Sequence, residues 1–101
     1  LILQPIVENA VFHGLASKTE EPSIFFEITY MENILKIVIS DNGVGIPSEK
    51  LERMNNQHDL GYGLKNVIFR LEYYYKGKYS LRFISPEDGG TAVIITIREI
   101  F

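Results

Sequence analysis

The feature that most constrains the fold of this 101-residue chain is a pattern of apolar residues at every second position, which occurs in two separate regions. The alternation runs over 24–31 and 34–41, and again over 79–85 and 91–99. A period of two is typical of strands that bury one face, and short polar turns join the members of each pair. The sequence therefore predicts two β-hairpins.

Helical spacing of apolar residues predicts three further elements. The first helix covers 3–15, the second is short and begins with Ser48 as its N-cap, and the third starts near Gly63 and ends around 75–77. Between the last two, 55–60 lacks any periodicity and is expected to form a mobile loop. The order helix, two strands, two helices, two strands predicts an α+β fold, in which a mixed, mostly antiparallel sheet carries helices on one face.

Length and composition favour a single domain over residues 1–101, because 46% apolar and 12% aromatic residues supply one compact core. The net charge of −3 disfavours nucleic-acid binding, which needs clustered Lys and Arg. Without cysteine, a disulfide framework or a thiolate metal site is excluded. No apolar run approaches the roughly 20 residues of a membrane span, and the start without Met, inside an apolar segment, indicates a fragment of a longer chain.

The first helix carries polar residues with a notable spacing. Asn9 and His13 are four positions apart, so they lie on one helix face about 6 Å apart along the axis. An amide oxygen can join the octahedral oxygen shell of Mg²⁺, and an imidazole can donate to a phosphate. Taken alone, the segment is better explained by an amphipathic helix with a polar side.

A second segment follows the second predicted strand directly. Asp41 has the same parity as Ile37 and Ile39, so its carboxylate is expected to face inward, where it needs a hydrogen-bond donor. The amine of an adenine is one such donor. Gly43 and Gly45 allow the backbone to approach a ligand closely or to take positive φ. The alternative is an ordinary turn, since Asp, Asn and Gly are common turn residues.

A third segment, Gly61 to Asn66, leads into the last predicted helix. Glycines before a helix N-terminus expose backbone N–H groups at the positive end of the helix dipole, which favours phosphate binding. Lys65 adds a positive charge. A flexible entry into the helix is the alternative interpretation of the two glycines.

In this order the three segments resemble the N box and the two glycine boxes of the GHKL ATPase superfamily, over nearly the whole chain. The resemblance implies a Bergerat-type two-layer α/β sandwich that binds ATP and Mg²⁺. It implies that Asn9 ligates the metal, that Asp41 accepts a hydrogen bond from the adenine amine, and that Thr91 helps to hold the adenine through water. The nucleotide-binding residues predicted in this way are Asn9, His13, Asp41, Gly43, Gly45, Ile46, Gly61, Tyr62, Gly63, Leu64, Lys65 and Thr91.

The branch of the superfamily is indicated by the residue four positions before Asn9. Members that hydrolyse ATP carry a glutamate there, whereas this chain has Pro5, which cannot act as a general base. Glu8, adjacent to Asn9, points about 100° away from it on the helix and is a poor geometric substitute for that glutamate, but it is expected to act on metal-bound water, so Glu8 and Asn9 are the predicted catalytic residues. The segments 3–10, 41–46 and 63–67 are most similar to those of LytS/YehU-type sensor histidine kinases.

This resemblance implies the catalytic domain of a two-component sensor histidine kinase. It would donate the γ-phosphate of ATP to a histidine on dimerisation helices upstream, and a response regulator would be the next partner. We expect a cytoplasmic domain of a membrane-anchored bacterial sensor, which alone binds ATP without autophosphorylation. His13 and His58 are not expected to be acceptors. The alternatives are an anti-sigma-factor-like serine kinase, or a degenerate binding module in which Phe12 replaces a phosphate-contacting Lys or Arg.

Overall fold

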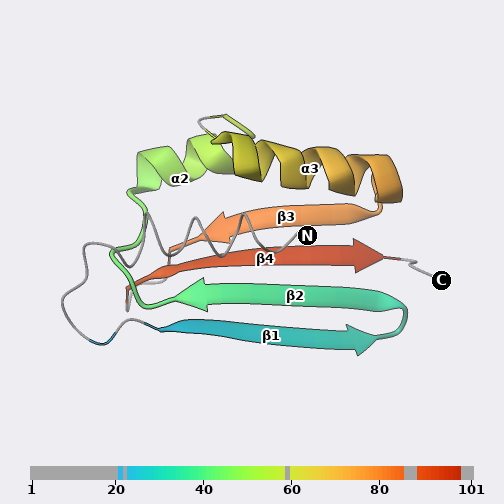
Figure 1. Cartoon of the computed structure of the whole chain (residues 1–101), viewed down its shortest axis with the longest axis horizontal. Coiled ribbons are helices and arrows are strands. Elements are labelled where there is room, and N and C mark those ends of the chain that lie inside the picture. The colour runs from blue at the N-terminus through green and yellow to red at the C-terminus, as the bar shows by residue number, and fades with distance from the viewer. Residues whose placement is uncertain (1–20, 22, 59, 86–88, 99–101) are drawn as a thin grey trace.

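The computed structural model describes residues 21, 23–58, 60–85 and 89–98 (Figure 1). The helix predicted over 3–15 lies outside these residues. The described elements, in chain order, are β1 (Ile24–Met31), β2 (Ile34–Asp41), α2 (Ser48–Asn55), α3 (Tyr62–Tyr75), β3 (Tyr79–Ile84) and β4 (Thr91–Arg98).

The strands form one sheet in the order β1-β2-β4-β3, and all three neighbouring pairs are antiparallel (Figure 1). Both predicted hairpins are confirmed, and they join through their inner strands β2 and β4. The parallel component of the predicted mixed sheet has no counterpart among the described strands. With two helices packed against the sheet, the α+β class is confirmed.

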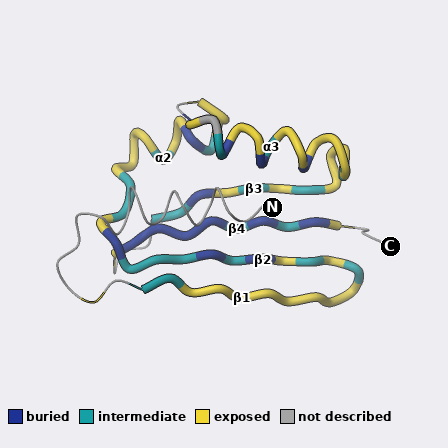
Figure 2. Tube along the Cα trace, viewed as in Figure 1, coloured by how far each residue is buried: buried dark blue, intermediate teal, exposed yellow. Residues whose placement is uncertain are grey.

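One face of the sheet carries the core. The register aligns Ile39, Val93 and Phe83 across β2, β4 and β3, so their side chains share a face, as directly paired residues do in antiparallel strands. Helices α2 and α3 contribute the opposing layer, and Figure 2 shows buried residues on both sides of the contact. The buried cluster consists of Ile37, Ile39, Met54, Leu60, Leu64, Val67, Leu71, Phe83, Val93, Ile95 and Ile97.

Strand β1 takes little part in this core. Both described helices lie on the β3 side of the sheet, and β1 is the strand farthest from them (Figures 1 and 2). As a result Phe26 and Ile28 are 52% and 61% exposed, although they share a face with the buried Ile37 and Ile39. On the opposite face of β1, Met31 is 73% exposed. The alternation of β1 was predicted correctly, but it does not correspond to burial among the described residues.

The short helix α2 differs in two details from the prediction. Ser48 is its first residue and Pro47 occupies the N-cap position without a side-chain hydrogen bond, so the prediction of Ser48 as the N-cap was wrong. Asn55, expected in the loop, is the last residue of α2. Its Nδ2 donates to the backbone O of Phe83 at 2.9 Å, and the N–H of Phe83 donates to its Oδ1 at 2.8 Å. Asn55 thereby holds α2 to the edge strand β3 as a neighbouring strand would.

Helix α3 begins one residue before the predicted start. Gly61 is its N-cap, with φ −71° and ψ 171°, and Tyr62 is its first residue. The helix ends at Tyr75, and Lys76 and Gly77 with positive φ turn the chain into β3. Neither α2 nor α3 is long and apolar enough to cross a membrane.

Candidate functional site

The predicted site residues of the sheet lie at one of its ends. Strand β2 ends with Asp41 and β4 begins with Thr91, and the two are direct partners in the register (Figure 1). Asp41 is half-buried, while Thr91 is 8% exposed and is the one polar residue among the described residues that is buried. A carboxylate and a hydroxyl group therefore stand side by side at the end of the core face, as their parity predicted.

The carboxylate of Asp41 is oriented by the turn that follows it. The backbone N–H of Gly43 donates to Oδ1 of Asp41 at 2.8 Å, and Gly43 itself is buried. Among the described residues, this is the hydrogen bond that the carboxylate accepts. Since an ionised carboxylate offers about four acceptor positions, Asp41 keeps the capacity to accept hydrogen bonds from a ligand.

Asn42 holds the same turn to the start of β1. Its Oδ1 accepts from the N–H of Ser23 at 2.9 Å and its Nδ2 donates to the O of Glu21 at 2.8 Å. Its own backbone N–H donates to the O of Ser23 at 3.3 Å. The side chain next to Asp41 is therefore a structural bridge, which the sequence motif alone did not reveal.

The other side of the turn is held by Ser85, which the sequence analysis missed. Its Oγ accepts from the N–H of Ile46 at 3.1 Å and donates to the O of Gly90 at 3.0 Å. Gly45 has φ +81°, and a Cβ there would lie 2.7 Å from Ser85 Oγ. No periodic pattern marks a serine at the end of a strand, so only the structure identifies this contact.

The third predicted segment is split between surface and core. Gly61 and Lys65 are exposed, whereas Leu64 is 4% exposed and belongs to the core cluster. The first turn of α3 contains no acidic residue, so its positive dipole end is not compensated from within the helix. Gly63 is half-buried, and of Tyr62 only the backbone is described. The uncompensated dipole of α3 and the exposed Lys65 therefore give this end of the helix a positive character.

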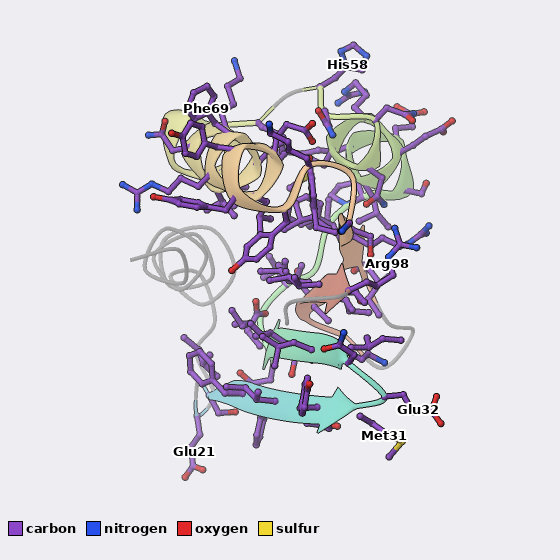
Figure 3. All side chains as sticks on the ribbon, turned by 90° about the vertical axis from the view of Figure 1, so that its right-hand side faces the viewer. Glu21, Met31, Glu32, His58, Phe69 and Arg98 are labelled. Carbon is purple, nitrogen blue, oxygen red and sulfur yellow. The ribbon has the colours of Figure 1, made fainter. Side chains whose placement is uncertain are left out.

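The turn after β2 and the start of α3 share one core. Ile46 packs against the cluster that contains Leu60 and Leu64, so these apolar residues fix both segments relative to the sheet. His58, in the connection between α2 and α3, is exposed and points away from the sheet (Figure 3).

The predicted metal and catalytic residues Glu8, Asn9 and His13 lie outside the described residues, and their roles remain predictions. Phe12 lies there as well. Within the part of the chain that the structure describes, no three His, Cys, Asp or Glu side chains group as a metal site. The described residues thus form the end of the site that contains Asp41 and Thr91. The predicted Mg²⁺ ligand, Asn9, lies outside them.

Comparison with protein families identifies a match over almost the whole chain. The profile of the family described as histidine kinase-, DNA gyrase B- and HSP90-like ATPase matches residues 1–100.

Several curated proteins are similar over almost the whole chain. The sensor histidine kinase YesM of Bacillus subtilis (strain 168) is 32% identical over 97 residues, covering 96% of this chain and 16% of the relative. The sensor protein LytS of Staphylococcus saprophyticus is 32% identical over 100 residues, covering 94% and 17%. The uncharacterized protein YwpD of Bacillus subtilis (strain 168) is 34% identical, covering 96% and 35%. The chain spans about a third or less of the length of these relatives.

Solved structures show the same fold. The nucleotide-free catalytic domain of histidine kinase ThkA matches with a TM-score of 0.73 at 20% identity, over 97% of this chain and 64% of that one. The histidine kinase domain of the blue-light activated kinase from Erythrobacter litoralis matches with a TM-score of 0.72 at 20% identity, over 96% and 41%.

Proposed function

Because the chain belongs to the family of histidine kinase-, DNA gyrase B- and HSP90-like ATPases, we propose that it is the ATP-binding catalytic domain of a sensor histidine kinase. The pairing of Asp41 with Thr91 at the end of the core face carries this proposal. The similarity to YesM and LytS supports the kinase branch of the family.

In the proposed site the adenine lies against the end of the sheet. Asp41, with its carboxylate oriented by Gly43, accepts a hydrogen bond from the exocyclic amine, and the hydroxyl of Thr91, a residue that is 8% exposed, contacts the ring through water. A half-buried carboxylate with a fixed orientation selects a donor at one position of a flat ligand, because leaving such an acceptor unpaired is costly. This arrangement favours adenine over guanine, which carries an oxygen at the equivalent position.

The triphosphate then extends toward the start of α3. Backbone N–H groups near Gly61 and Gly63 and the charge of Lys65 stabilise its negative oxygens. Asn9 is proposed to ligate Mg²⁺, with His13 beside it and Glu8 acting on metal-bound water. When bound, the metal neutralises phosphate charge. The γ-phosphoryl group would pass to a histidine nitrogen on dimerisation helices outside these residues, leaving ADP, and later to a response regulator.

Calorimetric titration with ATP and ADP, with and without Mg²⁺, tests the nucleotide site. We expect binding by the unaltered chain and a loss of roughly 10- to 100-fold in affinity for Asp41→Asn, because a hydrogen bond to a charged group is removed. Glu27→Gln, which removes the same charge at an exposed position of β1, should leave the affinity unchanged. Equal binding by the unaltered chain and Asp41→Asn would exclude the proposed adenine contact.

Phosphoryl transfer is tested by adding labelled ATP to the chain together with the dimerisation helices of the parent protein. We expect acid-labile labelling of those helices, as phosphohistidine requires. Acid-stable labelling of a partner protein would favour the serine kinase alternative. Nucleotide binding without any transfer would favour the degenerate module.

The location of the parent protein is a separate part of the proposal. The relatives YesM and LytS carry the word sensor in their names, and a kinase that uses ATP works in the cytoplasm. We therefore propose a cytoplasmic domain of a membrane-anchored sensor. Fractionation of cells that express the full-length protein, with protease digestion from the outside, would test it.

A further inference from the structure

Ser85 connects the two turns that surround the Asp41–Thr91 pair. Strands β2 and β3 end, and β4 begins, at the same end of the sheet (Figure 1). Ser85 follows β3 directly, and its hydroxyl group accepts from the N–H of Ile46 at 3.1 Å and donates to the O of Gly90 at 3.0 Å. One side chain therefore joins the turn after β2 to the turn before β4.

Two glycines bring these turns into close contact. Gly45 has φ +81°, and a Cβ there would lie 2.7 Å from Ser85 Oγ and 3.1 Å from the O of Gly90. Gly90 also has φ +81°, and a Cβ there would overlap the backbone O of Asp41. At Gly45 and Gly90 the backbone therefore leaves no room for a side chain, and the hydroxyl of Ser85 lies at this contact.

This contact bears on the two residues to which adenine binding has been assigned. Gly90 immediately precedes Thr91, and the turn held at Ile46 contains Gly43, whose N–H orients the carboxylate of Asp41. Without the Ser85 hydroxyl, the N–H of Ile46 and the buried carbonyl of Gly90 lose this partner, and both turns gain freedom to move. A loss of preorganisation weakens binding because the ligand must then order the turns itself.

We propose that Ser85 is a positioning residue for the adenine end of the nucleotide site, and that it acts by fixing the two turns rather than by touching the ligand. The inference rests on the proposed function, since it assigns a role within the same site. It predicts that the affinity for the base depends on a hydroxyl group that belongs to neither of the glycine boxes.

The test compares calorimetric affinities for ATP and for adenosine, which has no phosphates. Ser85→Ala should weaken the binding of both ligands by the same factor of about ten. A change of this size in Kd corresponds to the net free energy of one or two hydrogen bonds. Ser85→Thr, which keeps the hydroxyl, should retain most of the affinity. Hydrogen exchange at the amide of Ile46 should become faster in Ser85→Ala by more than the loss of global stability accounts for. If Ser85→Ala does not fold, Ser85→Cys, with a weakly bonding thiol of similar size, replaces it with the same expectation.

Asn55→Ala is the matched control. It also removes two hydrogen bonds from a side chain to the backbone near the end of β3, but these lie on the outer edge of the sheet at Phe83. It should lower the unfolding midpoint and change the adenosine affinity by less than about twofold.

The outcomes separate this inference from the proposed function. If the unaltered chain binds neither ATP nor adenosine, the proposed function fails, and the inference with it. Should the unaltered chain bind both while Ser85→Ala binds them equally well, only the role of Ser85 is disproved. Equal losses in Ser85→Ala and Asn55→Ala would also disprove it, because they indicate a general effect of stability.

Discussion

Gly90 shows at the scale of one residue how closely the backbone is packed around the candidate site. Its φ is +81°, in the left-handed region, and a Cβ would overlap the backbone O of Asp41 and lie 3.2 Å from the Cα of Asn42. The preceding Gly89 has a φ of +103°, yet nothing lies within 4 Å of a Cβ placed there. The two neighbouring glycines therefore separate the cost of an unfavourable φ from the cost of a steric clash.

We predict that Gly90→Ala lowers the free energy of unfolding by about 3 kcal/mol, of which roughly 1–2 kcal/mol comes from the left-handed backbone and the rest from overlap with fixed backbone atoms. Gly89→Ala should cost only about 1–2 kcal/mol, since the backbone term alone remains. Urea unfolding of both variants measures the difference. Equal losses for the two substitutions would show that the clash at Gly90 is relieved without cost.

At the scale of elements, the contact between α3 and β3 includes a tyrosine, Tyr79, whose pKa is shifted. Burial raises the pKa of Tyr79 above its ordinary value of 10.0, and a hydrogen bond to the carboxylate of Glu72, together with the negative charge of that carboxylate, raises it further. The folded state thus holds the phenolic proton more tightly than the unfolded state. The contribution to stability is fully present below pH 10 and is lost as the pH rises through the raised value.

The pH dependence of stability should therefore change when this hydroxyl is removed. Between about pH 9.5 and 11, we expect the unaltered chain to lose more unfolding free energy than Tyr79→Phe, because the unfolded state releases its proton first. Urea titrations at successive pH values measure the two slopes. Tyr74→Phe, at a ring that is 70% exposed, serves as the control and should follow the unaltered chain. A slope that is identical in all three proteins would contradict the role of Tyr79.

The sequence predicted those elements whose signals are local. Residues 24–31 and 34–41 each keep an apolar residue at nearly every second position, and the bounds of β1 and β2 agree with the structure. The prediction of Ser48 as the N-cap was wrong by one residue, because α2 already begins at Ser48 and Pro47 is the N-cap. Helix boundaries are set by backbone hydrogen bonds, which residue preferences locate only to within one or two positions. Ser85 was missed because its bonds join residues 5 and 39 positions away, and no sequence period records such contacts.

At the scale of the whole molecule, nucleotide binding and folding are linked. The core residues Ile39 and Val93 are paired with each other, and the next pair on the same face is Asp41 and Thr91. The register that builds the core therefore also forms the site. A ligand that binds only the folded chain must stabilise this whole arrangement by mass action.

We predict that ATP with Mg²⁺ at about a hundred times its Kd stabilises the chain by about 2.7 kcal/mol. For a chain of this length, the melting temperature should rise by roughly 10–20 °C. In Asp41→Asn the same ligand concentration should give a much smaller rise. Differential scanning calorimetry with and without nucleotide measures both, and a rise of equal size in the two proteins would contradict the assignment of Asp41.

The strand order is the property of the whole molecule that the sequence did not predict. Alternation in β1 indicates a buried face, but burial depends on which strands lie beneath the helices, and this follows from the order β1-β2-β4-β3. Leu64 illustrates the same point within the site. It was predicted to bind nucleotide, and its side chain is 4% exposed within the core. The contact of Leu64 with nucleotide stays a prediction.

The exposed edge strand β1 has a practical consequence for handling the protein. An eight-residue strand with large apolar side chains such as Phe25, Phe26 and Met31 exposed on both faces is a template for pairing between molecules. We expect these exposed apolar side chains, together with a net charge of only −3, to favour association between molecules at high concentration. Concentrated samples call for low temperature, dilute storage or a solubilising fusion partner.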